Sequence, residues 1–261
     1  MSKTPFDGRV ALVTGGGSGI GRAAAIGLLR DGARVAIVGR GEPRLEETAA
    51  LSGGCMLVVA GDVARPDDVA GAFRLTRERL GPVDLLVNAA GIYERDSLAQ
   101  FDMERWRATM EANLLGPALA IHHALPDMLQ RDFGRIVTIG SRSAHAGGAV
   151  TSAYSASKAG IEALTRSVAH EILWKRKGRP DVQANVLYPG PTVTELLDTA
   201  IARPERFQAP EEVYPYIRAL MMRPRWAGSG EIVYRTRIVS RGGTRLVAKH
   251  WRANFQRWLA R

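Results

Sequence analysis

The stretch that decides the fold of this chain of 261 residues is RVALVTGGGSGIG, which runs from Arg9 to Gly21. Its first five residues are largely aliphatic and predict a buried strand. A glycine-rich turn, Thr14–Gly21, comes next. Apolar residues at helical spacing then predict a helix that ends at Asp31-Gly32. Residues 34–38 predict a second strand, which completes a βαβ unit.

This glycine turn has the properties of a phosphate-binding loop. Glycines let the backbone approach a pyrophosphate with no Cβ in the way, and the following helix offers free N–H groups and a positive dipole. A flexible glycine-rich loop with no ligand is the alternative. The strand before the turn and the helix after it favour a dinucleotide site.

Strand and helix patterns continue to alternate along the chain. Further strands are expected at 56–60, 83–87, 135–139, 182–187 and 228–234. Further helices are expected at 66–80, 102–113, 118–129, 154–177 and 211–222. This alternation predicts an α/β fold, a doubly wound parallel sheet of about seven strands with helices on both faces. We expect a single domain over residues 1–240.

The composition is ordinary for a globular protein, with 46% hydrophobic and 24% charged residues. No apolar run approaches the ~20 residues of a membrane span, and the N-terminus lacks the apolar stretch of a secretory signal. We therefore expect a cytoplasmic protein. The single cysteine, Cys55, is expected to pack as a small hydrophobic residue. The five His residues do not cluster, so no metal site is expected.

The net charge of +10 is concentrated at the C-terminal end. Eleven Lys and Arg residues lie from Arg218 onward, against the single acid Glu231. Residues 241–261 predict a basic amphipathic extension, which could pack on its own domain or on a second subunit, lie on a membrane, or bind nucleic acid. We favour packing or a subunit contact, because exposed aromatic residues are costly, and expect no nucleic-acid partner.

Tyr154 and Lys158 stand four residues apart within a predicted helix. At this spacing two side chains lie on one face of the helix, one turn apart. A free phenol ionises near pH ~10, and a neighbouring positive charge lowers that pKa. The pair is a candidate for proton transfer. The alternative is an exposed Tyr and an exposed Lys with no catalytic role.

Ordered motifs give the chain a resemblance to the short-chain dehydrogenase/reductase family. They are Thr14-Gly15-x3-Gly19-Ile20-Gly21, Asn88-Ala89-x-Gly91, Ser141 thirteen residues before Tyr154-x3-Lys158, and Pro189-Gly190-x3-Thr194. The resemblance covers roughly residues 7–235 and implies a Rossmann-type fold. It also implies an NAD(P)(H)-dependent oxidoreductase that interconverts a carbonyl and a secondary alcohol on a small organic substrate, as a homodimer or homotetramer.

The resemblance implies four catalytic residues. Tyr154 would exchange a proton with the substrate oxygen, and Ser141 would polarise the carbonyl. Lys158 would lower the pKa of Tyr154 and bind the nicotinamide ribose. Asn113 would hold a water molecule that links Lys158 to solvent.

Two of these assignments have alternatives. Ser143 is the rival of Ser141, since it offers the same hydroxyl two residues further on. Asn113 could instead sit at a helix kink and bond the backbone near Gly116-Pro117.

The same resemblance places a set of residues at the cofactor. They are Gly15, Ser18, Gly19, Ile20, Gly21, Arg40, Asp62, Val63, Asn88, Ala89, Gly91, Tyr154, Lys158, Pro189, Gly190, Thr192 and Thr194. Arg40 follows the second strand, where an acid suits the ribose 2′-hydroxyl of NAD and an arginine suits the 2′-phosphate of NADP. We therefore favour NADP(H), with Glu42 as the residue that would favour NAD(H). Asp62 would meet the adenine amino group, or cap the helix that opens near Pro66.

Two segments are expected to shape the substrate site, the loop 142–152 with Arg142 and His145, and a lid within 192–210. His145 could serve as an acid, as a substrate anchor or as neither. The absence of a Gly-x-Ser-x-Gly elbow excludes a serine hydrolase of that type. Two other functions stay open: a catalytically silent dinucleotide-binding sensor or scaffold, and a partner- or membrane-binding protein that acts through the basic extension.

Overall fold

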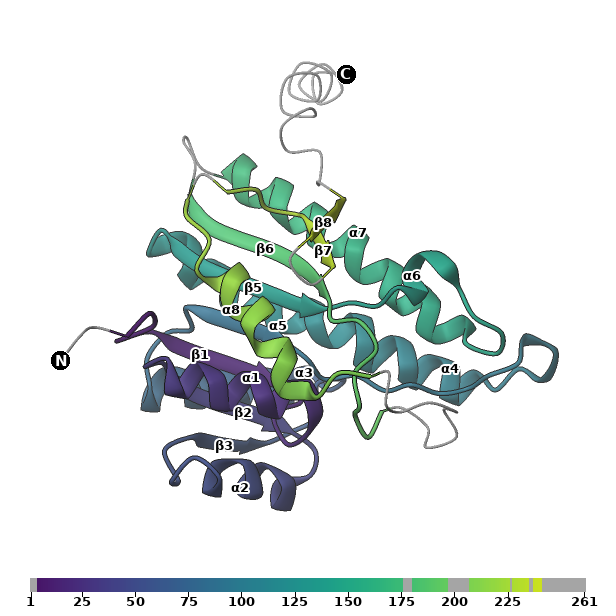
Figure 1. Cartoon of the computed structure of the whole chain (residues 1–261), viewed down its shortest axis with the longest axis horizontal. Helices are drawn as coiled ribbons and strands as arrows, with labels where there is room; N and C mark the ends of the chain where they lie inside the picture. Colours follow the sequence, from purple (N-terminus) through teal and green to yellow (C-terminus); the bar gives the residue numbers. More distant parts are fainter. Residues whose placement is uncertain (1–3, 176–179, 197–206, 226, 235–236, 241–261) are drawn as a thin grey trace.

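The computed structural model describes residues 4–175, 180–196, 207–225, 227–234 and 237–240. These form one eight-stranded sheet in the order β3-β2-β1-β4-β5-β6-β7-β8 (Figure 1). The strands are β1 (Val10–Thr14), β2 (Arg34–Gly39), β3 (Leu57–Ala60), β4 (Leu85–Asn88), β5 (Phe133–Ile139), β6 (Asp181–Tyr188), β7 (Ile232–Tyr234) and β8 (Arg237–Ser240). All neighbouring pairs from β3 to β7 are parallel, which confirms the predicted doubly wound sheet.

The eighth strand was not expected from the sequence. β8 pairs with β7 in the antiparallel direction. Only two residues separate these strands along the chain, which is too few for the crossover that parallel pairing requires. The edge of the sheet is therefore one strand further out than predicted.

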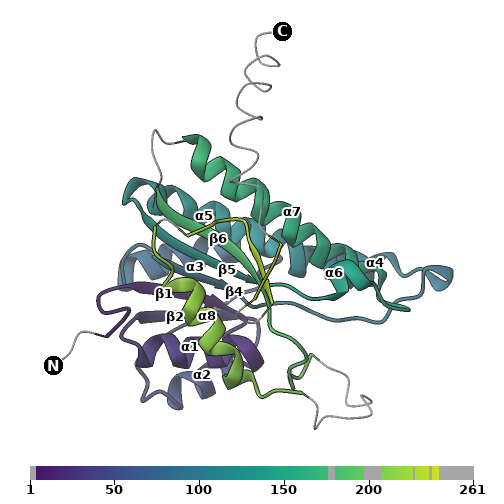
Figure 2. The same ribbon diagram turned by 45° about the horizontal axis from the view of Figure 1, so that its top comes forward.

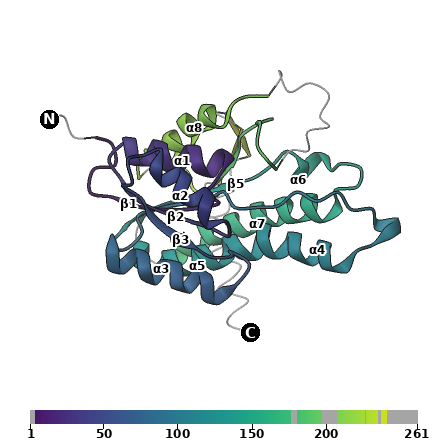
Figure 3. The ribbon, with the colours of Figure 1, turned by 90° about the horizontal axis from the view of Figure 1, so that it is seen from below.

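Helices cover both faces of the sheet (Figure 3). One face carries α1 (Gly19–Arg30), α2 (Glu42–Ala50) and α8 (Tyr214–Met221). The opposite face carries α3 (Pro66–Arg79), α5 (Gly116–Gln130) and α7 (Ser152–Lys175). Within the described residues, no helix has the length and apolar character needed to cross a membrane.

Short elements gather where α7 begins. α4 (Met103–Met110) and α6 (Ser143–Ala146) both pack against α7, and Figure 2 shows them together at that side of the molecule. A π-helix, η2 (Glu111–Leu115), joins α4 to α5, and two 3-10 helices are η1 (Leu98–Gln100) and η4 (Pro210–Val213). The loop predicted at 142–152 therefore contains one helical turn.

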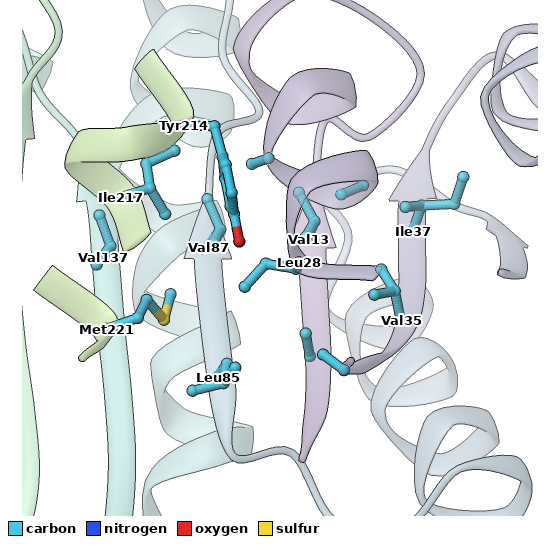
Figure 4. Packing of buried hydrophobic residues seen from close by; sticks show 14 of the residues in the cluster. Val13, Leu28, Val35, Ile37, Leu85, Val87, Val137, Tyr214, Ile217 and Met221 are labelled. Atoms are coloured by element: carbon cyan, nitrogen blue, oxygen red, sulfur yellow. The ribbon is translucent and has the colours of Figure 1, made fainter. Parts of the chain in front are cut away.

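Buried hydrophobic side chains fill the space between the sheet and helices α1 and α8 (Figure 4). Leu28 of α1 and Ile217 of α8 are fully buried over the central strands, and the Tyr214 ring lies between the two helices. A Cβ at Gly27 would come within 2.4 Å of Tyr214 Cγ. The Tyr214 hydroxyl also donates a hydrogen bond to Asp31 Oδ2 at 2.7 Å, which ties α8 to the end of α1.

We expect Gly27→Ala to lower the free energy of unfolding by about 1–3 kcal/mol, because the new methyl group must displace the Tyr214 ring. The matched control is Gly71→Ala in α3, where a Cβ would meet nothing within 4 Å. That control should gain about 0.5–1 kcal/mol from the higher helix propensity of alanine. Urea denaturation measures both, and equal effects of the two substitutions would contradict the packing.

The prediction that Cys55 packs as a hydrophobic residue is wrong, because its thiol is exposed. Cys55 follows Gly53 and Gly54, which both adopt positive φ in the turn after α2. Strand β3 begins two residues later, at Leu57. The apolar run in the sequence thus starts before the strand itself.

The order of the strands reverses between β1 and β4. In doubly wound sheets the crevice at the carboxyl ends of two such strands is where ligands bind. The glycine turn leaves β1 at this point, and Asn88-Ala89-Ala90-Gly91 leaves β4 there. Residues 197–206 of the predicted lid and the extension 241–261 lie outside the described residues, so the division at residue 240 stays a prediction.

Candidate active site

The glycine turn leaves no room for side chains at two positions. Gly15 has φ +70°, and a Cβ there would lie 2.7 Å from Ala90 N. A Cβ at Gly21 would lie 2.1 Å from Gly15 O. The turn therefore packs tightly against the segment after β4, and the cleft between them is lined by Gly15, Ser18, Ala90 and Gly91 among others.

Arg22 holds the glycine turn in place, a role that no sequence pattern indicated. Its Nη2 donates a hydrogen bond of 2.7 Å to Gly17 O, and its Nε donates one of 3.0 Å to Thr48 Oγ1 in α2. Its guanidinium also forms an ion pair with Glu47 at 2.9 Å. These contacts join residues 5 to 26 positions apart.

The end of the cleft beside β2 is basic. Arg40, predicted as a cofactor contact, lines it together with Arg44, which the sequence reading missed. Arg44 lies in the first turn of α2 and forms an ion pair with Glu195. Glu42, which would favour NAD(H) instead, is the first residue of α2.

Asp62 and Val63 line the same cleft on the side of β3. Asp62 Oδ1 accepts a hydrogen bond from Ala64 N at 3.0 Å. The alternative role as helix cap is wrong, because α3 begins at Pro66 with Arg65 in the cap position. The carboxylate therefore orders its own loop at the edge of the cleft.

Asn88 and Ala89 fix the exit from β4. The buried Asn88 side chain donates a hydrogen bond of 3.2 Å to Thr138 Oγ1 of β5. Thr14 Oγ1 accepts hydrogen bonds of 3.2 Å from Ala89 N and Ala90 N. The structure thus places Asn88 beneath the cleft, and Ala90 and Gly91 on its surface.

Asn113 is fully buried in the π-helix, and its side chain bonds a different segment from the one expected. Its Oδ1 accepts a hydrogen bond from Ile92 N at 2.8 Å, and its Nδ2 donates to Ile92 O at 2.9 Å. A third hydrogen bond of 3.2 Å reaches Ser157 Oγ on α7. The alternative of a side-chain bond near Gly116-Pro117 is therefore wrong. Asn113 instead connects α7 to the segment after β4.

Proline at position 117 also affects Asn113. In an α-helix the carbonyl of residue 113 accepts from the N–H of residue 117, and Pro117 has no N–H. A π-helix at this point, a feature often found at functional sites, re-routes the backbone hydrogen bonds. The Asn113 carbonyl therefore lacks its usual α-helical donor.

Tyr154, Lys158 and Ser141 come together at the beginning of α7. Tyr154 is 8% exposed and Lys158 5%. Lys158 Nζ lies 5.5 Å from the centroid of the Tyr154 ring and donates a hydrogen bond of 2.9 Å to Ile139 O of β5. The alternative of two exposed side chains is therefore wrong.

The charges at this site are set mainly by burial. Burial lowers the pKa of Lys158 to about 8. Burial raises the pKa of Tyr154, a hydrogen bond with Ser141 lowers it, and the neighbouring Tyr93 raises it. The pKa of Tyr154 is therefore raised, whereas a nearby lysine alone would lower it. Desolvation of the phenol outweighs the other effects.

Ser141, rather than Ser143, is the serine with a hydrogen bond to Tyr154. Ser143 starts α6, and its hydroxyl lies 3.2 Å from Ser141 Oγ. Ser143 N also donates to Ser141 Oγ at 3.2 Å. Ser143 thus contacts the Ser141 hydroxyl through both its own hydroxyl and its backbone N–H.

Tyr93 is a third residue that was not predicted from the sequence, after Arg22 and Arg44. Its ring meets the Tyr154 ring edge-on, with centroids 4.9 Å apart and an interplanar angle of 81°. Tyr93 follows Ile92, whose backbone is held by Asn113. The same asparagine therefore positions an aromatic wall against the Tyr154 phenol.

His145 in α6 faces helix α7. Its Nε2 lies 3.2 Å from Glu162 Oε1, and Arg166 lies 3.7 Å from the same carboxylate. Burial raises the pKa of Glu162, while His145 and Arg166 lower it. Arg142, by contrast, is exposed at the start of α6. Among the residues that the structure describes, no group of three His, Cys, Asp or Glu side chains is arranged to hold a metal ion.

The segment after β6 crosses to the glycine turn. Thr192 Oγ1 accepts a hydrogen bond of 3.1 Å from Gln208 Nε2 and donates one to Gly190 O at 3.1 Å. Gln208 Nε2 also donates to Pro189 O. Thr194 lies over the turn, since a Cβ at Gly19 would be 3.1 Å from Thr194 Cγ2. Thr194 thus lies beside the glycine turn. The predicted cofactor contacts that line the cleft itself are Gly15, Ser18, Arg40, Asp62, Val63 and Gly91.

Residues 9–204 match the family model described as short chain dehydrogenase. The chain belongs to the short-chain dehydrogenase family. One similar member is D-beta-hydroxybutyrate dehydrogenase of Rhizobium meliloti, 33% identical over 198 residues, with 74% of this chain and 75% of the relative covered. Another is 3-oxoacyl-(acyl-carrier-protein) reductase of Mus musculus, 38% identical over 188 residues, with 72% and 77% covered.

Solved structures of short-chain dehydrogenases agree with this fold. One described as a short chain dehydrogenase/reductase family protein superimposes with a TM-score of 0.77 at 35% identity, over 88% of this chain and 96% of the other. As a short-chain dehydrogenase, the protein is an oxidoreductase of the carbonyl–alcohol type that uses NAD(P)(H). The cleft fits such a dinucleotide, because its glycine turn excludes Cβ atoms and its far end carries two arginines.

Proposed function

We propose that this short-chain dehydrogenase reduces a ketone on a small organic substrate, with Tyr154 as the proton donor and NADP(H) as the preferred cofactor. The observation that carries the proposal is the burial of the Tyr154 side chain beside Ser141, Tyr93 and Lys158. A buried phenol whose pKa is raised holds its proton at neutral pH. That state suits donation to a carbonyl oxygen that gains negative charge.

Ser141 has the geometry of an assisting donor. Its hydroxyl bonds Tyr154, so a carbonyl oxygen that reaches the phenol also reaches the serine. Two hydroxyl donors directed at one oxygen stabilise the charge that develops on it. The nicotinamide cofactor, when bound, supplies the hydride to the carbonyl carbon.

Lys158 and Asn113 supply the proton path in this proposal. The Lys158 ammonium lies on the same side of α7 as the phenol and stabilises the phenolate left after proton donation. Lys158 would also bind the nicotinamide ribose. Pro117 has no N–H to donate to the Asn113 carbonyl. That carbonyl is therefore suited to hold a water that returns a proton to Lys158.

The preference for NADP(H) rests on the basic end of the cleft. Gly39 stands where an acid would bind the 2′-hydroxyl of NAD, and Arg40 and Arg44 line the cleft beside it. Guanidinium groups bind phosphate through paired hydrogen bonds. The arrangement therefore suits a 2′-phosphate better than a free hydroxyl.

Members of this family are commonly oligomeric, and we propose a homodimer or homotetramer. The chain offers exposed apolar residues for such a contact, with Leu115 at 42% and Trp174 at 51% exposure near the beginning of α5 and the end of α7. Sedimentation measures the assembly state directly.

The function is tested by turnover of the full chain with NADPH and with NADH against acetoacetate, 3-oxoacyl thioesters, other ketones and aldehydes. The first two follow the names of the similar enzymes. We expect at least one ketone to be reduced, faster with NADPH at equal concentration. A chain that binds NADPH but reduces no carbonyl compound would instead be a silent dinucleotide-binding sensor or scaffold.

We expect the rate of reduction to fall as the pH rises through about 8, where Lys158 loses its proton. The pKa of Lys158 is lowered from 10.5, so its charge is complete below this range and lost above it. Tyr154, whose pKa is raised, should titrate only at higher pH. The measurement is kcat between about pH 6 and pH 10.

The matched variant for this pH profile is Lys158→Arg. A guanidinium stays charged up to about pH 12, so the variant should be slower but should not lose activity near pH 8. A wild-type profile that is flat through pH 8 would show that the charge on Lys158 does not control the step.

A further inference from the structure

A short segment after β6 contacts two of the elements that border the cofactor cleft. We call residues 192–196 the strap. Thr194 lies against the glycine turn, 3.1 Å from where a Cβ of Gly19 would stand. Glu195, the next residue, forms an ion pair with Arg44 at the start of α2. The strap therefore contacts both the glycine turn and the start of α2, which lie side by side.

The ion pair engages one of the two arginines at the basic end of the cleft. Arg40 and Arg44 both line this end, with Gly17 and Gly41 beside them. Across the described segments, Glu195 pairs with Arg44, and no carboxylate pairs with Arg40. The nearby Glu47 is already bound to Arg22.

The ion pair is open to exchange. The side chains of Arg44 and Glu195 are 61% and 56% exposed. Ion pairs this exposed add little to stability. A dianionic phosphate binds a guanidinium more strongly than one carboxylate does, and it does so through two parallel hydrogen bonds. An anion that arrives in the cleft can therefore replace Glu195 on Arg44.

We propose that Glu195 tunes the cofactor preference by competing with a ribose 2′-phosphate for Arg44. NADP(H) would displace Glu195 from Arg44 and release that end of the strap. NAD(H) has a hydroxyl at this position, so the ion pair would persist. Glu195 is thus a specificity-determining residue that acts through Arg44, an inference that rests on the proposed use of the cleft by a nicotinamide dinucleotide.

The test uses two fragments and needs no turnover. Adenosine 5′-monophosphate and adenosine 2′,5′-bisphosphate differ only in the 2′-phosphate, and calorimetry at fixed ionic strength gives their affinities for the full chain. The discriminating quantity is the ratio of the two affinities. We expect Glu195→Gln to raise this ratio by up to about fivefold, the scale of one exposed ion pair.

Arg44→Gln should lower the same ratio by roughly tenfold to a hundredfold, the range for a hydrogen bond to a charged group. In the double variant Arg44→Gln/Glu195→Gln, the ratio should equal that of Arg44→Gln alone, because Glu195 then has no partner through which to act. The charge-matched controls are Glu46→Gln on the exposed side of α2 and Arg74→Gln on α3. Both should keep the wild-type ratio.

The results that would contradict the inference also show which part of it is wrong. If the wild type binds neither fragment, the dinucleotide site and the proposed function fail together. If it binds both and Glu195→Gln leaves the ratio unchanged, only the role of Glu195 fails. If Glu195→Gln raises the affinity for both fragments equally, the strap limits the binding of either nucleotide and does not select between them. If Glu195→Gln still raises the affinity ratio when Arg44 is also replaced, Glu195 acts through another group.

Discussion

Tyr154→Phe is expected to lower kcat/KM for carbonyl reduction by about 10²–10⁴-fold, the usual contribution of a positioned general acid. The substitution removes the hydroxyl alone, so the ring keeps its edge contact with Tyr93. The affinity for NADPH should stay unchanged, since the adenosine end of the cleft is untouched. Steady-state kinetics and a fluorescence titration of NADPH measure the two quantities.

The matched control is Tyr214→Phe in the core between α1 and α8. Tyr214 is also buried, and its hydroxyl bonds Asp31. This variant should lose stability but keep the wild-type kcat. A Tyr154→Phe enzyme that turns over at the wild-type rate would show that another group donates the proton.

The second large effect is expected for Asn113→Ala. This change removes one buried and two partly buried hydrogen bonds, and it leaves Ile92 N–H and C=O without their partner. Buried groups left unsatisfied cost about 1–3 kcal/mol each, so we expect a loss of roughly 2–4 kcal/mol in the free energy of unfolding. The activity should also fall by about 10²-fold, because Tyr93 and α7 lose the side chain that aligns them.

Thr109→Ala is the comparison for Asn113→Ala. Thr109 is equally buried, one turn earlier on the path through α4, but its hydroxyl bonds only the carbonyl of Arg105 in its own helix. It should lower stability by about 1 kcal/mol and leave kcat unchanged. If Asn113→Ala changes stability without changing kcat at a temperature where it is fully folded, Asn113 has a purely structural role.

Features that depend on local pattern could be predicted from the sequence. Residue spacing within one element was enough to predict the glycine turn and the Tyr154–Lys158 pair. The alternation of strand and helix patterns was enough to predict the parallel sheet. Ser141 could be separated from Ser143 only by resemblance, and the hydrogen bond with Tyr154 supports that choice.

Features that depend on contacts between distant segments could not be predicted. The Arg22 bonds to Gly17 and Thr48, and the pairing of Arg44 with Glu195, join residues whose proximity follows only from the packed fold. Charged residues on helices are usually solvated, so their sequence positions carry no such information.

The pKa values at the site also depend partly on local spacing and partly on contacts between distant segments. A lysine one turn from a tyrosine predicts a lowered phenol pKa, but burial of both groups reverses the direction for Tyr154. Burial depends on what α7 packs against, including Tyr93 and the end of β5. The spacing therefore predicted that the two side chains lie together, while the directions of their pKa shifts required the fold.

The most direct test of the account is a single measurement on the wild-type chain. NADPH consumption and alcohol formation are followed together, with the ketones of the panel as substrates. We predict that at least one ketone is converted to its alcohol, with one NADPH oxidised per molecule of alcohol formed. Binding of NADPH with no alcohol formed from any ketone would contradict the proposed reaction.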